Sequence, residues 1–143
     1  MTLPAFALID AGPLIAYYNT RDRYHHSIRG FLVAYTGQPV TIDPCITEAM
    51  HYLRSDYRVQ VKFAEHIAQG LWQRENLAQS DFNRVAELIG LYRDLPGDFA
   101  DLSLVAVSER LDIPEVITLD SDFDVYRRYR RHPFKRIYYP SGA

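Results

Sequence analysis

Acidic side chains stand at places where this chain is expected to pass from one secondary-structure element to the next. Asp10 follows the apolar run 6–9 and precedes a Gly-Pro pair, which is typical of a buried strand that ends before a helix. Asp120 follows the apolar run 116–119 in the same way. Ligands of α/β proteins bind beyond the carboxyl ends of parallel strands, so these two aspartates would meet there if their strands are neighbours.

Glu48 and Asp101 lie on expected helices and would complete a ring of carboxylates. Glu48 falls within the helical stretch 45–53, and Asp98 and Asp101 stand on one helix face, three residues apart. Single acids of this kind also suit a helix cap, a solvated helix surface or the positive end of a helix dipole. Asp101 needs a further explanation, because the ten residues after it are typical of a buried helix, and a buried carboxylate requires a partner. The pattern therefore predicts a metal centre whose oxygen ligands favour Mg²⁺ or Mn²⁺ over zinc.

Several other metal and nucleotide motifs do not fit this sequence. Glu48-Ala-Met-His51 matches the Glu-x-x-His of di-iron bundles, which need that motif twice, and it occurs once. Residues 120–124 resemble the start of an EF-hand loop, but Val125 replaces the glycine at position six and Arg131 replaces the final glutamate. The chain has no P-loop, no Gly-x-Gly-x-x-Gly, no Gly-x-Ser-x-Gly and no His-Glu-x-x-His.

A basic segment follows Asp120 closely. Across residues 125–136, six Arg or Lys side chains are interleaved with aromatic ones, Tyr126, Tyr129 and Phe134. Arginines bind phosphates through paired hydrogen bonds and aromatic rings stack on unpaired bases, although a solvated surface that balances the acidic part of the chain is the alternative. A metal centre beside a phosphate-binding surface favours phosphodiester cleavage. The residues expected to contact nucleic acid are Arg127, Arg128, Tyr129, Arg130 and Arg131.

Strands that alternate with helices are expected to position these residues. Such alternation predicts an α/β fold in which a largely parallel sheet carries helices on both faces. The expected strands are 5–10, 39–42, 115–119 and 136–139, and the stretch 71–79 is ambiguous between strand and loop. The expected helices are 13–19, 24–35, 45–53, 57–69, 81–93 and 98–111.

Length and composition favour one compact soluble domain. The chain has 143 residues, 48% of them apolar and 24% charged, which disfavours a disordered or collagen-like protein. Cys45 is the only cysteine, which excludes an internal disulfide and a thiolate metal cluster. No segment approaches the roughly 20 apolar residues that cross a bilayer, and the first residues lack the pattern of a signal peptide. We therefore expect a cytoplasmic protein, and its net charge of -2 does not by itself indicate a polyanionic partner.

These residues, taken together, resemble a PIN domain, and specifically the VapC-type toxin ribonucleases of prokaryotic toxin–antitoxin pairs. Residues 8–16 resemble the first strand and helix of the family, and Asp22-Arg-Tyr-His25 resembles the Asp-x-x-His that follows them in many members. Three later segments are similar to those that carry the second, third and fourth acids of the family; they are 47–53, 94–109 and 118–123. The chain departs from the family pattern at Ala11, where Thr or Ser is usual, and at Gly97 and Phe99, where larger aliphatic residues are usual.

The resemblance implies a single PIN-like domain over residues 1–143, with a central parallel sheet of about four to five strands sandwiched by helices. It implies Mg²⁺- or Mn²⁺-dependent endonucleolytic cleavage of RNA by a toxin that inhibits translation. A homodimer and a small antitoxin that blocks the site are the implied partners. The implied catalytic and metal-binding residues are Asp10, Glu48, Asp101 and Asp120, with Asp98 and Asp122 as secondary carboxylates.

Two other functions remain as alternatives on the sequence alone. A non-catalytic RNA-binding or protein-interaction module would keep the fold and a structural cation, but it would not need all four acidic positions. A phosphatase or phosphotransfer domain would use a strand-end aspartate as nucleophile, but the segment after Asp10 lacks the Asp-x-Asp pattern of such enzymes. Metal-dependent turnover of single-stranded RNA would distinguish the first alternative from a ribonuclease.

Overall fold

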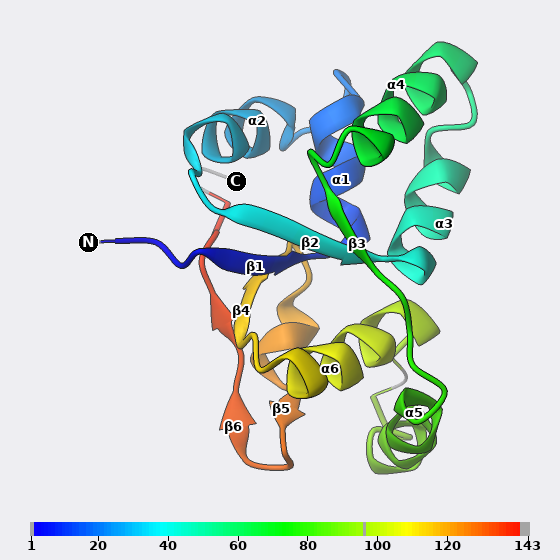
Figure 1. Ribbon diagram of the computed structural model, residues 1–143, viewed down its shortest axis with the longest axis vertical. Helices are drawn as coiled ribbons and strands as arrows, with labels where there is room; N and C mark the ends of the chain where they lie inside the picture. The colour runs from blue at the N-terminus through cyan, green and yellow to red at the C-terminus, as the bar shows by residue number, and fades with distance from the viewer. Residues whose placement is uncertain (1, 96, 141–143) are drawn as a thin grey trace.

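A parallel sheet forms the centre of the computed structural model, which describes residues 2–95 and 97–140 (Figure 1). Its strand order is β3-β2-β1-β4-β7, and β5 and β6 form a separate antiparallel hairpin. The strands are β1 Phe6–Ile9, β2 Gln38–Ile42, β3 Gln73–Glu75, β4 Glu115–Ile117, β5 Arg127–Arg128, β6 His132–Pro133 and β7 Lys135–Arg136. The helices are α1 Ala11–Tyr18, α2 His25–Ala34, α3 Asp43–Tyr52, α4 Tyr57–Ala68, α5 Asp81–Leu91, α6 Phe99–Leu111 and the short 3-10 helix η1 Ser121–Asp124. Within the described residues, no helix is long and apolar enough to cross a membrane.

Helices cover both faces of the sheet, with α1, α2 and α4 on one side and α5 and α6 on the other (Figure 1). The side chains of β1 alternate between the two cores that result. Leu8 packs in the core that includes α5 and α6, whereas Ala7 and Ile9 pack in the core that includes α1, α2 and α4. A strand that is buried on both faces is expected to be apolar throughout, which explains the apolar residues 7–9; Phe6, at the start of the strand, is exposed.

The predicted α/β fold with a helix-covered parallel sheet of four to five strands is confirmed. The ambiguous stretch 71–79 contains the edge strand β3, which has only three residues. The hairpin of β5 and β6 was not predicted, because each of its strands has two residues and its turn carries no glycine or asparagine. Tyr129 and Arg130 adopt positive φ angles of 50° and 70° in that turn, a conformation that their residue types do not indicate.

The two strands that end in aspartate are neighbours. Leu8 is paired with Val116 and Ile9 with Ile117, and the strands run in parallel. The backbone amide of Asp10 continues the pairing and donates to the Ile117 carbonyl oxygen at 3.0 Å. The carboxyl ends of β1 and β4 therefore deliver Asp10 and Asp120 to the same edge of the sheet.

Candidate metal centre

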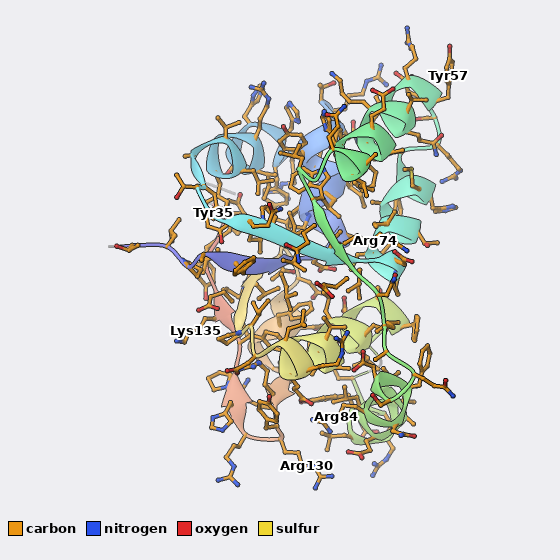
Figure 2. The ribbon with its side chains drawn as sticks, in the orientation of Figure 1. Tyr35, Tyr57, Arg74, Arg84, Arg130 and Lys135 are labelled. Carbon is orange, nitrogen blue, oxygen red and sulfur yellow. The ribbon has the colours of Figure 1, made fainter. Side chains whose placement is uncertain are left out.

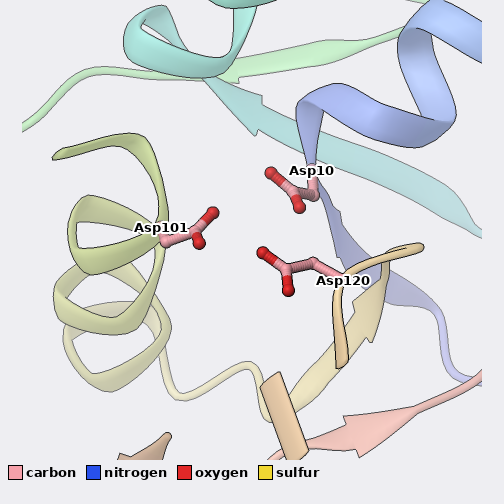
Figure 3. A group of neighbouring side chains, drawn as sticks. All are labelled: Asp10, Asp101 and Asp120. Atoms are coloured by element: carbon pink, nitrogen blue, oxygen red, sulfur yellow. The ribbon is translucent and has the colours of Figure 1, made fainter. Parts of the chain in front are cut away.

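Three aspartates from three elements meet beyond the carboxyl ends of β1 and β4. One carboxylate oxygen from each of Asp10, Asp101 and Asp120 lies within 4.8 Å of the other two. Figure 3 shows the three carboxylates directed toward one another, Asp101 from α6 and the other two from the ends of the strands. The structure thus brings together three of the four residues implied as catalytic, and their chemical role stays a prediction.

Asp10 caps α1 and belongs to the cluster at the same time. Its Oδ1 accepts a hydrogen bond from the Ala11 amide at 2.8 Å, and its Oδ2 accepts one from Thr118 Oγ1 at 3.0 Å. The side chain is only 5% exposed. Each carboxylate oxygen carries two lone pairs, so Oδ2 keeps one acceptor position for another ligand, whereas Oδ1 also has a long contact with the Cys45 thiol at 3.9 Å. The capping and metal-binding interpretations of Asp10 are therefore compatible.

Thr118 links Asp10 to Asp120. Its fully buried hydroxyl donates to Asp10 Oδ2 and accepts a hydrogen bond from the Asp120 amide at 2.9 Å. Asp120 Oδ1 in turn accepts the Asp122 amide at 2.9 Å, at the start of η1. Thr118 was recognised from the sequence only as part of a family motif, and no role was predicted for it. Its position two residues before a strand-end aspartate is the signal that could have identified it.

The start of α6 holds Asp101 toward the cluster. Asp98 caps this helix, and its Oδ1 accepts the Asp101 amide at 2.8 Å. The buried Tyr126 donates its hydroxyl to Asp101 Oδ2 at 3.3 Å. Gly97 makes room for that hydroxyl, because a Cβ atom at position 97 would clash with Tyr126 Oη. The departure from the family pattern at position 97 therefore accompanies a tyrosine that contacts the acidic cluster.

A cavity of about 220 Å³ contains the cluster and the fourth acidic position. Glu48, on α3, lines this cavity, and so does Asp98. Asp122 is not among the lining residues, although its amide holds the Asp120 carboxylate. The cavity is lined by Asp10, Ala11, Gly12, Glu48, Asp98, Asp101, Leu119 and Asp120.

Burial and repulsion by neighbouring carboxylates disfavour the ionised forms of Asp10, Glu48 and Asp101. Burial raises the pKa of Asp10 from 3.8 to about 7; the bonds from Ala11 and Thr118 lower it, and neighbouring carboxylate charges raise it again. Burial, followed by the charge of Asp10, raises the pKa of Asp101 to about 9. The pKa of Glu48 is also raised, by burial and then by the charges of neighbouring carboxylates. Asp101, and Asp10 in part, therefore retain their protons at neutral pH unless a positive charge compensates them.

The donor set fits a hard divalent cation. The potential side-chain ligands that line the cavity are carboxylates, which Mg²⁺ and Mn²⁺ prefer, and a cation would offset the repulsion among them. The one nearby sulfur ligand does not change this conclusion. Burial raises the pKa of the Cys45 thiol well above its usual value, so the thiol that contacts Asp10 at 3.9 Å stays protonated.

We expect the substitution Thr118→Val to weaken Mn²⁺ binding roughly 10- to 100-fold, because metal ligands depend on such supporting hydrogen bonds. Valine has the shape of threonine but leaves Asp10 Oδ2 without its donor and the Asp120 amide without its acceptor. Isothermal titration calorimetry measures the effect, and Thr118→Ser, which retains the hydroxyl, serves as the control. Equal Mn²⁺ affinities of the parent and Thr118→Val would contradict the role assigned to this hydroxyl.

Two arginines of the basic segment bind the backbone of segments that carry the acids. Arg128 is 5% exposed, and its guanidinium donates to the Ser108 carbonyl oxygen on α6 at 3.0 Å. The side chain of Arg136 is 6% exposed and donates to the Thr118 carbonyl oxygen at 3.2 Å. Both side chains therefore hold the backbone of segments that carry the acids, and the burial of Arg128 restricts its access to a phosphate.

The other residues predicted to contact RNA lie at or near the turn between β5 and β6. Arg127 donates to three backbone carbonyl oxygens, those of residues 124–126. Arg130 pairs with Glu87 at 3.2 Å, and Arg131 and Tyr129 are exposed. Figure 2 shows Arg130 at the lower end of the molecule, whereas the starts of α1 and α3 lie near mid-height in the same orientation (Figure 1). Of the three interleaved aromatic residues, only Tyr129 is exposed, because the other two are buried in the core.

Comparison with known proteins identifies the class that this fold and site define. The family model of the PIN domain matches residues 7–129, so the chain belongs to the PIN domain family, and the resemblance to that family is confirmed. No curated protein sequence matches the chain.

Among the solved structures that share the fold, two illustrate the similarity. One is VapC20 of Mycobacterium tuberculosis, described as a sarcin-ricin loop cleaving toxin. It has a TM-score of 0.77 and 16% identity over 83% of this chain and 93% of that chain. The other is a toxin–antitoxin complex from Klebsiella pneumoniae, with a TM-score of 0.62 and 20% identity over 80% of this chain and 87% of that chain. At these identities the likeness is one of fold.

Proposed function

We propose that this protein is a divalent-metal-dependent endoribonuclease of the VapC toxin type, which cuts RNA and thereby inhibits translation. The observation that carries the proposal is the meeting of Asp10, Asp101 and Asp120 in a cavity that Glu48 also lines. Membership of the PIN domain family supports it, and so does the fold shared with a toxin described as cleaving the sarcin-ricin loop.

The acids have distinct positions in the proposed reaction. Asp10, Asp101 and Asp120 would hold a divalent cation through their converging carboxylate oxygens. When bound, the cation would supply a water activated for attack on a phosphodiester and would stabilise the negative charge on the phosphate. Glu48 is less buried than Asp10 and Asp101 and stands across the cavity on α3, where it can accept hydrogen bonds from water. Asp98 acts through the Asp101 amide and Asp122 through the Asp120 carboxylate, so both are positioning residues.

Cleavage of single-stranded RNA in Mg²⁺ or Mn²⁺ and in EDTA tests the proposal. We expect the parent protein to cut RNA when metal is present and to lose this activity in EDTA, with recovery when excess Mn²⁺ is added. Cutting at the same rate in EDTA would overturn the metal-dependent reaction. RNA binding without cleavage in either metal would instead favour the non-catalytic RNA-binding module.

We also propose that exposed arginines of the basic segment bind RNA, whereas Arg128 stabilises the fold. Changing both Arg130 and Arg131 to alanine should lower the slope of log affinity against log salt by about 0.7 for each phosphate that the variant no longer binds. The single change Arg128→Ala should instead reduce the free energy of unfolding by about 1–3 kcal/mol, because the buried Ser108 carbonyl oxygen loses its guanidinium partner. Filter binding at several salt concentrations and urea unfolding measure the two effects. An unchanged salt slope in the double variant would exclude these arginines as the RNA-binding residues.

A small antitoxin and a second copy of the chain are the proposed protein partners. The fold shared with a toxin–antitoxin complex supports the antitoxin. The apolar helix surface proposed for the homodimer includes Leu91, which is 54% exposed. The other residues of that surface, Phe31, Leu32 and Tyr92, are half-buried against the core. The proposed setting of this reaction is the cytoplasm, where RNA is translated. Light scattering that detects only a 16.6 kDa species at micromolar concentration would contradict the homodimer.

A further inference from the structure

An apolar groove adjoins the acidic cavity. Its volume is about 570 Å³, within the range of pockets that hold small organic ligands. Glu48 and Asp98 line both the groove and the acidic cavity, so the two spaces are adjacent. The groove is lined by Asp43, Pro44, Thr47, Glu48, Leu77, Phe82, Asp98, Phe99 and Ala100.

Two stacked phenylalanine rings form part of the groove wall. Phe82 comes from α5 and Phe99 from α6, and their ring centroids lie 5.8 Å apart with an angle of 26° between the ring planes. Phe82 is 49% exposed and Phe99 is 45% exposed, and neither belongs to the buried core. An aromatic pair that remains this exposed beside a candidate active site is suited to bind a planar apolar group.

The charges around the groove favour an uncharged ligand group. Asp43 is paired with Arg74 through two hydrogen bonds of 2.5 and 3.2 Å, so its charge is offset. The acids that remain, Glu48 and Asp98, stand where the groove joins the acidic cavity. They would repel a phosphate in the groove but not an aromatic ring, and the Thr47 hydroxyl on the groove wall can form a hydrogen bond with the edge of such a ring.

We propose that this groove binds one nucleobase of the RNA, in the nucleotide next to the bond that is cut, stacked on the pair of Phe82 and Phe99. The inference rests on the proposed ribonuclease function and adds a base-binding subsite to it. A base on this pair would place the adjacent phosphate near the acids, because the groove and the cavity share Glu48 and Asp98 as lining residues. Stacking on an aromatic ring accepts any base, so the subsite would position the strand more than it would read its sequence.

The test uses a single-stranded RNA that the parent protein cuts and whose cut bond has been mapped. We expect Phe99→Leu and Phe82→Leu, which keep the apolar volume but remove the ring, to raise KM roughly 5- to 150-fold. An abasic nucleotide at one position next to the cut bond should produce a similar loss in the parent protein and little further loss in the leucine variants. Phe82→Trp, which keeps an aromatic ring, should have a KM close to that of the parent, unlike Phe82→Leu. Ile89→Ala is the matched control, because Ile89 lies two turns further along the same face of α5, is 57% exposed and does not line the groove.

A second readout measures RNA binding instead of RNA cleavage. RNA with 2-aminopurine next to the mapped bond should lose fluorescence when it binds the parent protein, and should lose much less with Phe99→Leu, since stacking quenches this base. Phenylalanine variants that cut intact and abasic RNA as the parent does would overturn the base-binding subsite and leave the proposed function standing. If these variants lose self-association while cutting RNA normally, the groove is a protein interface instead. A parent protein that cuts no RNA would overturn the proposed function itself.

Discussion

Replacing Asp120 with asparagine is expected to lower the rate of RNA cleavage about 10³-fold, while RNA binding stays intact or becomes tighter. The substitution keeps the size of the side chain but removes one negative ligand from the cluster at the carboxyl ends of β1 and β4. Metal ions contribute several kcal/mol to the stabilisation of charge in such reactions, and each 1.36 kcal/mol changes the rate tenfold. Single-turnover cleavage at saturating RNA and Mn²⁺ measures the rate, and filter binding measures the affinity.

Asp10→Asn and Asp101→Asn are expected to behave in the same way, because each contributes one of the converging oxygens. Asp112→Asn is the matched control. Its side chain is 85% exposed, and asparagine tolerates the left-handed backbone at this position, where φ is 53°. Parent-like cleavage by Asp120→Asn would remove this residue from the catalytic set, and parent-like cleavage by all three variants would overturn the proposed site.

Without metal, the protein is expected to become less stable as the pH rises from about 5 to 9. The pKa values of Asp10 and Asp101 in the folded protein, about 7 and about 9, lie above the ordinary value of 3.8. The folded state therefore holds protons that the unfolded chain releases. The stability linked to these protons is complete below about pH 4 and is lost as the pH rises through the two folded-state values. Thermal unfolding in EDTA at several pH values measures this dependence.

Divalent metal should reverse much of that loss at pH 8, because it compensates the ionised carboxylates. At a metal concentration about 100-fold above the dissociation constant, binding adds roughly 2.7 kcal/mol, which raises Tm by roughly 10 °C for a chain of this size. In EDTA at pH 8, Asp101→Asn should melt above the parent, because it removes a carboxylate that repels its neighbours, and it should gain less from Mn²⁺. A Tm of the parent in EDTA that does not change between pH 5 and 9 would contradict the raised pKa values.

The acidic cluster illustrates how much of the site the sequence predicts. Two apolar strands that each end in aspartate predict a shared sheet edge once the strands are parallel neighbours, and the structure pairs Ile9 with Ile117 just before those residues. Asp101 was predicted because a carboxylate at the start of a buried helix needs a partner, and the structure directs it toward Asp10. Both arguments depend on local residue patterns and on general rules of α/β topology, so they can be made from a single sequence.

The supporting contacts depend on tertiary packing that no local pattern contains. In the sequence, Tyr126 is one of several interleaved aromatic residues. In the structure it is fully buried, and its hydroxyl contacts Asp101. In the sequence, Arg128 is one of several neighbouring basic residues. In the structure it is buried and contacts Ser108 on α6. The groove with Phe82 and Phe99 was also missed, because α5 and α6 bring together two rings that are 17 positions apart in the sequence.

The close packing of Gly97 against Tyr126 links two positions that lie far apart in the sequence. A side chain at position 97 clashes with the Tyr126 hydroxyl, and that hydroxyl is also the donor to Asp101. Gly97→Ala alone should therefore be poorly tolerated, whereas the same change together with Tyr126→Phe should be accommodated at the expense of the contact with Asp101. A side chain at position 97 consequently requires a change at position 126, so residues 97 and 126 form one unit of variation.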